Sequence, residues 1–518
     1  MHIPAISMEN PLLIKELRSR MRGAKAYWVL LVYLLILSIS LVIAYAIWSS
    51  QHGYAGRAFV MGRIFFQTLF GVQVGLVCLI APGLTAGTVT VEKEQQTYDL
   101  LAASPLAARS IIIGKLLSAL SFIVLLITSS LPLVSVCFLL GGVSPGEVFF
   151  AYLVLLLTAF MYGSVGIMWS SVARNTATAT LMTYGTVFAI FIGTMFFVAP
   201  FTGVPGPCLK AVNPVGAFMY VVSPEQYFGF TMPAWVPSLI LNGLAGILFT
   251  MIGVRKVDSY AVDKSVGLRV QSLLLYTAVV FFAFGSFFTM FGNRVGLTFE
   301  ELVYFPWAIV LTILLVVIPI FATGDVDARE PRRLPDFLIG GWRKLFRSTL
   351  ESGIPFIVLL LFMAAIVFLA GYPMTKMTVP GQLGWELPII LLVILAVVTA
   401  YGLISLLLSH ILKSRWAALM SSYLVMAIFV LLPLLTLTNW DGGNGEPVPY
   451  NPGWLTLYFN PHIAVSSVPY VLLTSMPDPS AGKIPFSYVT ILLYALIALL
   501  AAVKLRSILA PPHPQNDQ

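Results

Sequence analysis

The chain has 518 residues, of which 59% are hydrophobic and only 10% are charged. Soluble chains carry about 25% charged residues, and a soluble fold of this length has too little interior to bury so much apolar surface. The composition therefore excludes a water-soluble enzyme and an intrinsically disordered chain, and it predicts an integral membrane protein.

Twelve apolar runs follow one another along the chain. Each is close to the ~20 residues that a helix needs to cross a bilayer, and they lack the ten-residue alternation of a membrane barrel. The sequence therefore predicts an all-α polytopic membrane protein with about 12 transmembrane helices. The predicted spans are 27–48, 65–87, 114–140, 147–172, 177–200, 236–254, 272–291, 303–323, 354–371, 386–410, 417–437 and 486–503.

The lysines and arginines are divided unevenly between the two sides of these spans. Both termini and the five loops on their side carry 23 of them, whereas the loops on the opposite side carry 6. Because basic loops stay in the cytoplasm, we expect both termini to be cytoplasmic, in a multi-pass protein of the cell inner (cytoplasmic) membrane. The net charge of +8 is then a topology signal, and nucleic acid is not expected as a partner.

The N-terminal segment 1–26 contains a basic amphipathic stretch, 10–22. Its apolar residues recur at every fourth position, on a different face from its basic residues. Asn10 can cap a helix here, and Pro11 suits its first turn. We expect a helix that lies along the inner surface of the membrane, in contact with its lipids. The alternative is a polar leader that only sets the topology. The residues singled out are Lys15, Glu16, Leu17, Arg18 and Arg22.

The second predicted span carries glycines at a spacing of four residues, interrupted only at Leu79. Such a row forms a smooth ridge for close helix contact, and Pro82 within it can kink the helix. We expect this helix to slide or tilt when the loop that follows it moves; static packing is the alternative. The glycines are Gly71, Gly75, Gly83 and Gly87.

The loop after the second span, 88–113, begins with acidic residues and continues into the apolar pair Leu100 and Leu101. Acidic residues favour a helix N-terminus, and Pro105 ends the short helix. An apolar pair flanked by charges, in a loop that faces water, is typical of a docking surface. The alternative is a short helix that tucks the two leucines against the bundle.

Together these residues resemble the ABC-2 class of ATP-binding-cassette transporter permeases. Members of that family commonly carry Glu-Arg/Lys-Glu-x-Gly-Thr-x-Glu-x-Leu, then Thr/Ser-Pro-Leu, then Gly-Lys at the next span. Gln96 stands where the family has its glycine, and the opening from Asn10 to Arg18 is also similar. The positions that fit are Glu92, Lys93, Glu94, Thr97, Leu100 or Leu101, Ser104, Pro105, Leu106, Gly114 and Lys115.

The resemblance implies a separate ABC ATPase subunit, acting as a dimer on the cytoplasmic face. ATP and Mg would be held by that partner, so no cofactor is expected in this chain. The helix after the second span would be a coupling helix, and the N-terminal helix a connecting helix that also touches the ATPase. Relatives with six spans work as dimers, so it stays open whether one chain or a pair with a second permease chain forms the pore. The residues assigned to ATPase coupling are Glu92, Lys93, Glu94, Thr97, Leu100, Leu101, Pro105 and Leu106.

The two halves of the chain resemble each other at a shift of 239 residues. Because six spans per half is an even number, the halves would share one orientation as parallel repeats. The matched pairs are Tyr162 and Tyr401, Gly163 and Gly402, Ser170 and Ser409, Arg174 and Lys413, Ala179 and Ala418, and Tyr184 and Tyr423. The predicted parts are the amphipathic connecting helix in 1–26, a first six-helix half in 27–254 with the coupling loop 88–113, a cytoplasmic linker in 255–271, a second six-helix half in 272–503 with the cytoplasmic loop 324–353, and a disordered tail in 504–518.

Two long outer loops, 201–235 and 438–485, are rich in proline, glycine and aromatic residues. Each contains an Asn-Pro pair, at Asn213 and Asn460. Re-entrant half-helices and plain interfacial loops are equal alternatives for them.

None of the predicted spans has Asp, Glu, Lys or Arg near its centre. Ion-coupled carriers accept the cost of about 2.5–3.5 kcal/mol per charge because they need titratable groups in the pathway. The sequence also has no paired carboxylates at membrane depth, no metal-ligand cluster and no GxxxxGK[ST] phosphate loop. No catalytic or metal-binding residues are assigned, and the chain is not expected to be an enzyme.

The leading hypothesis is therefore a permease subunit that exports a substrate across the cytoplasmic membrane, driven by ATP hydrolysis on its partner. A polytopic enzyme acting on lipid or glycan is an alternative, but it would need acidic or histidine clusters at the membrane edge. An ion-coupled secondary transporter is a second alternative, and a scaffold subunit a third. The uncharged interior is compatible with a lipid, a hydrophobic drug or a carrier-bound glycan, so the sequence does not indicate the substrate.

Overall fold

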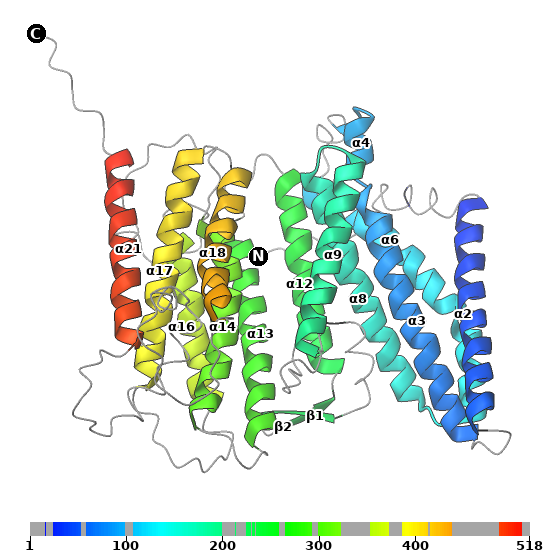
Figure 1. Ribbon diagram of the computed structural model, residues 1–518. Coiled ribbons are helices and arrows are strands. Elements are labelled where there is room, and N and C mark those ends of the chain that lie inside the picture. The colour runs from blue at the N-terminus through cyan, green and yellow to red at the C-terminus, as the bar shows by residue number, and fades with distance from the viewer. Residues whose placement is uncertain are drawn as a thin grey trace, which may run out of the picture. The chain divides into compact units, whose positions relative to one another are not determined.

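Helices dominate the part of the chain that the computed structural model describes (Figure 1). The described residues are 16, 24–52, 58–98, 107–198, 213, 224–228, 230–233, 235–257, 265–292, 299–322, 353–371, 386–412, 415–437 and 486–509. Contacts divide the chain into two compact units, Met1–Phe282 and Ala283–Gln518. The division falls inside the seventh predicted span, so the first unit also takes in the predicted linker 255–271.

The first unit is built mainly from apolar helices. At the start of α8, Ser144 and Glu147 form a capping box, in which each side chain accepts from the other residue's amide, a typical helix start. The helices are α2 (Ala24–His52), α3 (Ala58–Ala86), α4 (Thr90–Glu94), α6 (Ala108–Ser129), α7 (Leu131–Leu140), α8 (Pro145–Val172), α9 (Thr176–Val198), α12 (Trp235–Val257) and the larger part of α13 (Ser265–Gly292).

The second unit contains the end of α13 and five further described helices. They are α14 (Phe299–Ala322), α16 (Gly353–Gly371), α17 (Glu386–Leu412), α18 (Arg415–Leu437) and α21 (Phe486–Leu509). Each of the predicted apolar runs, in either unit, falls on helix. Within the described ranges, nine helices are long and apolar enough to cross a membrane, and three shorter apolar helices coincide with the fifth, eighth and eleventh runs. The all-α polytopic class is thus confirmed.

The third predicted span, 114–140, is not one continuous helix. It is divided into α6 and α7 at Ser130, and Pro132 lies in the first turn of α7. Proline cannot continue the ladder of the preceding helix, so the break follows from the sequence. The Ser130 hydroxyl donates to the carbonyl of Ile127 and accepts from the amide of Gln73 in α3. The break thereby provides a buried glutamine with a polar partner inside an apolar bundle.

The centre of the first unit is the contact between α3 and α8. At Gly166 in α8 an added Cβ would lie 2.9 Å from the carbonyl oxygen of Pro82 and would clash with the Thr85 hydroxyl. Only a residue without a side chain allows the two backbones to approach this closely. The C-terminal half of α8 is therefore held against the end of α3, just before α4 begins.

The outer loop 201–235 contains a short hairpin that the sequence analysis did not predict. β1 (Pro224–Tyr227) pairs antiparallel with β2 (Phe230–Pro233), with Tyr227 opposite Phe230. Asn213, from the predicted Asn-Pro pair, is buried and donates to the Thr194 hydroxyl of α9 at 3.0 Å. The loop is thus anchored on α9 at that point. The remainder of 201–223, for which re-entrant helices were considered, lies outside the described residues, as does Asn460.

Several helix contacts of the first unit recur in the second. α8 packs on α3, α6, α9 and α12, and α17 packs on α14, α16, α18 and α21. In α9 the Thr183 hydroxyl donates to the carbonyl of Ala179 at 2.7 Å, and in α18 the Ser422 hydroxyl donates to that of Ala418 at 2.7 Å. The register of 239 residues thus pairs residues that make the same contact, each within its own unit.

Candidate coupling junction

The segment Val89–Thr97, which follows α3 and which we call the junction, is a single helical turn with a defined end. The Thr97 amide donates to the Glu92 carbonyl at 2.9 Å, and the Gln96 amide donates to the Lys93 carbonyl at 3.2 Å. These two bonds form a Schellman motif. Gln96 has a φ of 57°, a left-handed conformation that costs an L-residue about 1–2 kcal/mol. The family's glycine therefore corresponds to a backbone position that favours glycine, and Gln96 adopts the same conformation.

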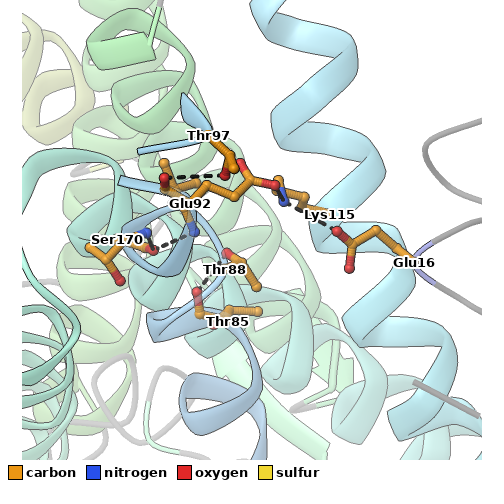
Figure 2. Close-up of polar contacts among 9 residues, drawn as sticks. Glu16, Thr85, Thr88, Glu92, Thr97, Lys115 and Ser170 are labelled. Atoms are coloured by element: carbon orange, nitrogen blue, oxygen red, sulfur yellow. Dashed lines mark hydrogen bonds and ion pairs between the residues drawn. The ribbon is translucent and has the colours of Figure 1, made fainter. Parts of the chain in front are cut away.

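Glu92 connects the junction to α6 through a buried lysine. Lys115 Nζ lies 2.6 Å from Glu92 Oε1 and 3.2 Å from Glu16 Oε1 (Figure 2). The Lys115 side chain is only 2% exposed, whereas the two glutamates are 22–23% exposed. A buried ammonium needs opposite charge close by, and here it receives it from two segments. The three residues join the N-terminal segment, the junction and the start of α6.

Lys93 connects the junction to the end of α8. Its Nζ donates to the carbonyls of Ser171 at 2.6 Å, Ala173 at 2.9 Å and Ser170 at 3.4 Å. The last carbonyls of a helix have no partner within the helix, and the helix dipole makes this end negative. An ammonium is therefore the natural cap, and Lys93 supplies it from another segment.

Glu94 connects the junction to the beginning of α9. Its carboxylate accepts from the Thr176 amide at 2.7 Å and from the Thr176 hydroxyl at 2.9 Å. A carboxylate at a helix N-terminus satisfies free amides and interacts favourably with the positive end of the helix dipole. Glu94 thus caps α9 as Lys93 caps α8.

Ser170 holds the start of the junction from the opposite side. Its buried hydroxyl accepts from the amides of Val89 at 2.9 Å and Thr90 at 3.2 Å (Figure 2). Amides at the start of a helix have no partner in the helix, so this hydroxyl stabilises the beginning of α4. The sequence analysis did not assign Ser170 to the site. The available signal was its match with Ser409 in the repeat register.

Three consecutive charged residues therefore attach one turn of helix to three different membrane helices. Their side chains were assigned to ATPase coupling, and the structure shows that they are engaged by the protein's own α6, α8 and α9. Thr97 lies at the exposed end of the turn, where its hydroxyl donates to the Glu92 carbonyl. Of the other residues assigned to coupling or to the connecting helix, Glu16 is described, and Leu100, Leu101, Pro105, Leu106, Lys15, Leu17, Arg18 and Arg22 lie outside the described residues.

The four glycines of α3 and of the turn after it do not form one contact ridge within the chain. Gly75 is exposed, and no described atom lies within 4 Å of a Cβ added there. Gly71 is half-buried, and a Cβ at Gly87 would meet only ordinary contacts. At Gly83 an added Cβ would lie 2.7 Å from the Tyr184 hydroxyl of α9. Among the described residues, α9 is thus a close neighbour of this face at Gly83 and no neighbour is seen at Gly75, and the predicted sliding or tilting of the helix stays a prediction.

The long apolar helices define a multi-pass membrane protein. Residues 11–255 match the family model described as ABC-2 family transporter protein. The match covers just under half of the chain and is consistent with an ABC-2 type permease, so it confirms the resemblance seen in the sequence for this region. Permeases of this family are membrane components that generally pair with an ABC ATPase subunit and are not themselves catalysts. The match ends before the second unit begins, and no curated protein matches the chain.

Proposed function

We propose that this chain is the permease subunit of an ABC transporter in the cytoplasmic membrane, with both termini in the cytoplasm, and that it exports its substrate. A separate ATPase subunit, acting as a dimer, binds ATP and Mg²⁺ and docks on the coupling loop 88–113. The chain itself holds no nucleotide. It converts the closing of the ATPase dimer into movement of its helices.

The observation that carries this proposal is the way the junction is attached. Glu92, Lys93 and Glu94 connect it to α6, α8 and α9, and it continues directly from α3. A force on the loop is therefore distributed over four helices at once, because hydrogen-bonded and ion-paired contacts resist being separated in an apolar surrounding. A loop that served only to join two spans would not require these attachments.

The charges of the junction and the docking surface then have separate roles. Glu92 and Lys93 are half-buried and engaged within the permease. The apolar residues Leu100, Leu101 and Leu106 are the better candidates for contact with the ATPase, since apolar side chains dominate the centre of protein interfaces. Charge-neutral variants of the junction should thus impair force transmission more than docking.

The test begins with the tagged chain purified from its native membrane. The co-purifying protein that carries Walker motifs is identified by mass spectrometry, and the two are reconstituted in lipid. We expect ATP hydrolysis to be faster with the permease than without it. The triple variant Glu92→Gln, Lys93→Met and Glu94→Gln should retain the ATPase but lose most of this stimulation.

The matched control is Lys256→Met, at an exposed lysine in the last turn of α12, which should behave like the wild type. Hydrolysis of ATP by the purified chain alone would contradict the proposal. So would the absence of a bound ATPase, or a triple variant with full stimulation.

A further inference from the structure

A proline interrupts the second membrane helix of each unit. In α3 this residue is Pro82, and in α14 it is Pro319, near the end of the helix. Proline has no N–H to donate to the carbonyl four residues earlier, and its ring crowds that carbonyl. Inside a membrane the opened backbone needs partners from neighbouring helices.

At Pro82 the carbonyl that loses its donor is that of Cys78, and a bend there also draws the Leu79 carbonyl away from the Gly83 amide. In the first unit a tyrosine of α9 provides a partner for the second of these carbonyls. The Tyr184 hydroxyl donates at 2.7 Å to the carbonyl oxygen of Leu79, three residues before Pro82. The hydroxyl reaches the backbone through space that Gly83 leaves open, since a Cβ at that position would lie 2.7 Å from it. This glycine thus has a specific use in admitting the tyrosine.

The second unit contains the same arrangement. The Tyr423 hydroxyl of α18 donates at 2.8 Å to the carbonyl oxygen of Val316, three residues before Pro319. Tyr184 and Tyr423 are a matched pair in the register of 239 residues. In both units a tyrosine hydroxyl thus donates to the carbonyl three residues before a proline. This recurrence indicates a role that the two units share.

In the first unit this bond is one of two contacts that attach the segment from α3 to α4 to α9. Glu94 holds the first residue of α9, Thr176, and Tyr184 lies two turns further along α9. The chain from α3 to α4 is thus attached to α9 at two points, and Pro82 lies between them. Movement of α4 against α9 must then be taken up where the helix ladder is weakest, at the proline.

We propose that Tyr184 and Tyr423 are positioning residues for two equivalent proline hinges, at which α3 and α14 bend during transport. Each hydroxyl holds the carbonyl one turn before the proline, so the helix bends without leaving that group unpartnered against apolar neighbours. The hinge is a property of the chain alone, while its part in transport rests on the proposed function.

Hydrogen–deuterium exchange of the full chain in lipid nanodiscs tests the hinge. Tyr184→Phe keeps the ring and removes the donor, and we expect the amides of residues 83–86 to exchange about three- to tenfold faster. Tyr423→Phe should do the same for residues 320–322. Tyr27→Phe, at a tyrosine of α2 that is 64% exposed, is the matched control and should leave both segments unchanged.

A double-mutant comparison separates the hinge from simple packing. Pro82→Ala restores a donor for the Cys78 carbonyl and removes the cause of the bend, which returns the Leu79 carbonyl to the Gly83 amide. Tyr184→Phe should therefore have little effect in that background. A packing role would give the same increase with or without the proline. If Pro82→Ala does not fold, Gly83→Ala serves instead, since its methyl group displaces the hydroxyl and should reproduce the effect of Tyr184→Phe.

Unchanged exchange in Tyr184→Phe, or an equal increase in the Pro82→Ala background, would overturn the proposal. In the complex with the ATPase, Tyr184→Phe should retain ATPase binding and reduce stimulated hydrolysis at least threefold. If wild type binds no ATPase, the proposed function fails, and the exchange data still decide whether the hinge exists.

Discussion

The buried Lys115 is the strongest single test of the junction, because one substitution removes the charge that two segments share. Its ammonium lies 2.6 Å from Glu92 and 3.2 Å from Glu16. Lys115→Met keeps an apolar side chain of similar length but leaves the carboxylates of Glu92 and Glu16 without their counter-ion. We expect the junction to open more often, since the tie between α4 and α6 is lost.

The magnitude follows from the geometry. With the ammonium gone, the two carboxylate oxygens are at most about 6 Å apart, and their repulsion is ~3 kcal/mol at an effective dielectric constant of ~20 and ~0.7 kcal/mol in bulk water. Both glutamates are 22–23% exposed, which places the pair between these limits. The other oxygen of Glu92 is buried without a described hydrogen-bond partner, so water relieves it poorly. A loss of about 1–3 kcal/mol is expected, which is a factor of ~5 to 150 in the open population.

The assay measures this opening through a thiol at Thr90, which is fully buried in α4. Thr90→Cys is introduced into a background without the native cysteines, and the rate of maleimide labelling is compared with and without Lys115→Met. Labelling tracks the open population when closing is fast, so the rate should rise by the factor given above. Lys256→Met should leave it unchanged, and the exchange of charges in Lys115→Glu with Glu92→Lys should recover part of the protection. A rise of less than twofold in Lys115→Met would refute the reasoning.

Three further substitutions test the surroundings of the junction. Gln96→Gly removes the cost of a left-handed glutamine and should stabilise the chain by about 1 kcal/mol, measured as a higher thermal midpoint in detergent. Gly166→Ala should lower that midpoint clearly, because its Cβ has no space against α3, whereas Gly75→Ala should leave it unchanged or slightly raised. Ser170→Ala leaves two buried amides without their acceptor and should accelerate labelling at the junction by an order of magnitude, given a cost of about 1–3 kcal/mol; an unaffected rate would mean that water replaces the hydroxyl.

Much of the fold was predictable because the length of an apolar run reports the thickness of a membrane directly. The length of a run that is apolar throughout does not show whether the helix is interrupted within it. Residues on both sides of Ser130 are equally hydrophobic, so one continuous helix was predicted where α6 and α7 together form one apolar segment long enough to cross a membrane. The signal was present in Pro132, which cannot continue a helix. A hairpin as short as β1 and β2 has too few residues to show a strand pattern.

The site was predictable as a motif but not as a set of contacts. The acidic and basic residues of the junction were assigned to ATPase coupling because their pattern resembles that of the family. Their actual partners lie far away in sequence, at Lys115, the end of α8 and Thr176. Neither spacing nor composition pairs such residues. The neighbours of the α3 glycines could not be predicted for the same reason, because periodicity defines the face of a helix and says nothing of what lies opposite.

The two units share the tyrosine and proline of the proposed hinge but differ at the junction. This difference indicates where a force on the cytoplasmic loops would enter the membrane helices. Both have the tyrosine and the proline, so both retain the proposed hinge. Within the described part of the second unit, α16 carries no charged residue, and the sequence of the loop 324–353 lacks the Glu-x-Glu pattern. The ion pairs of Lys115 are described in the first unit, and Lys115→Met should change exchange in α3 while leaving α14 as it is.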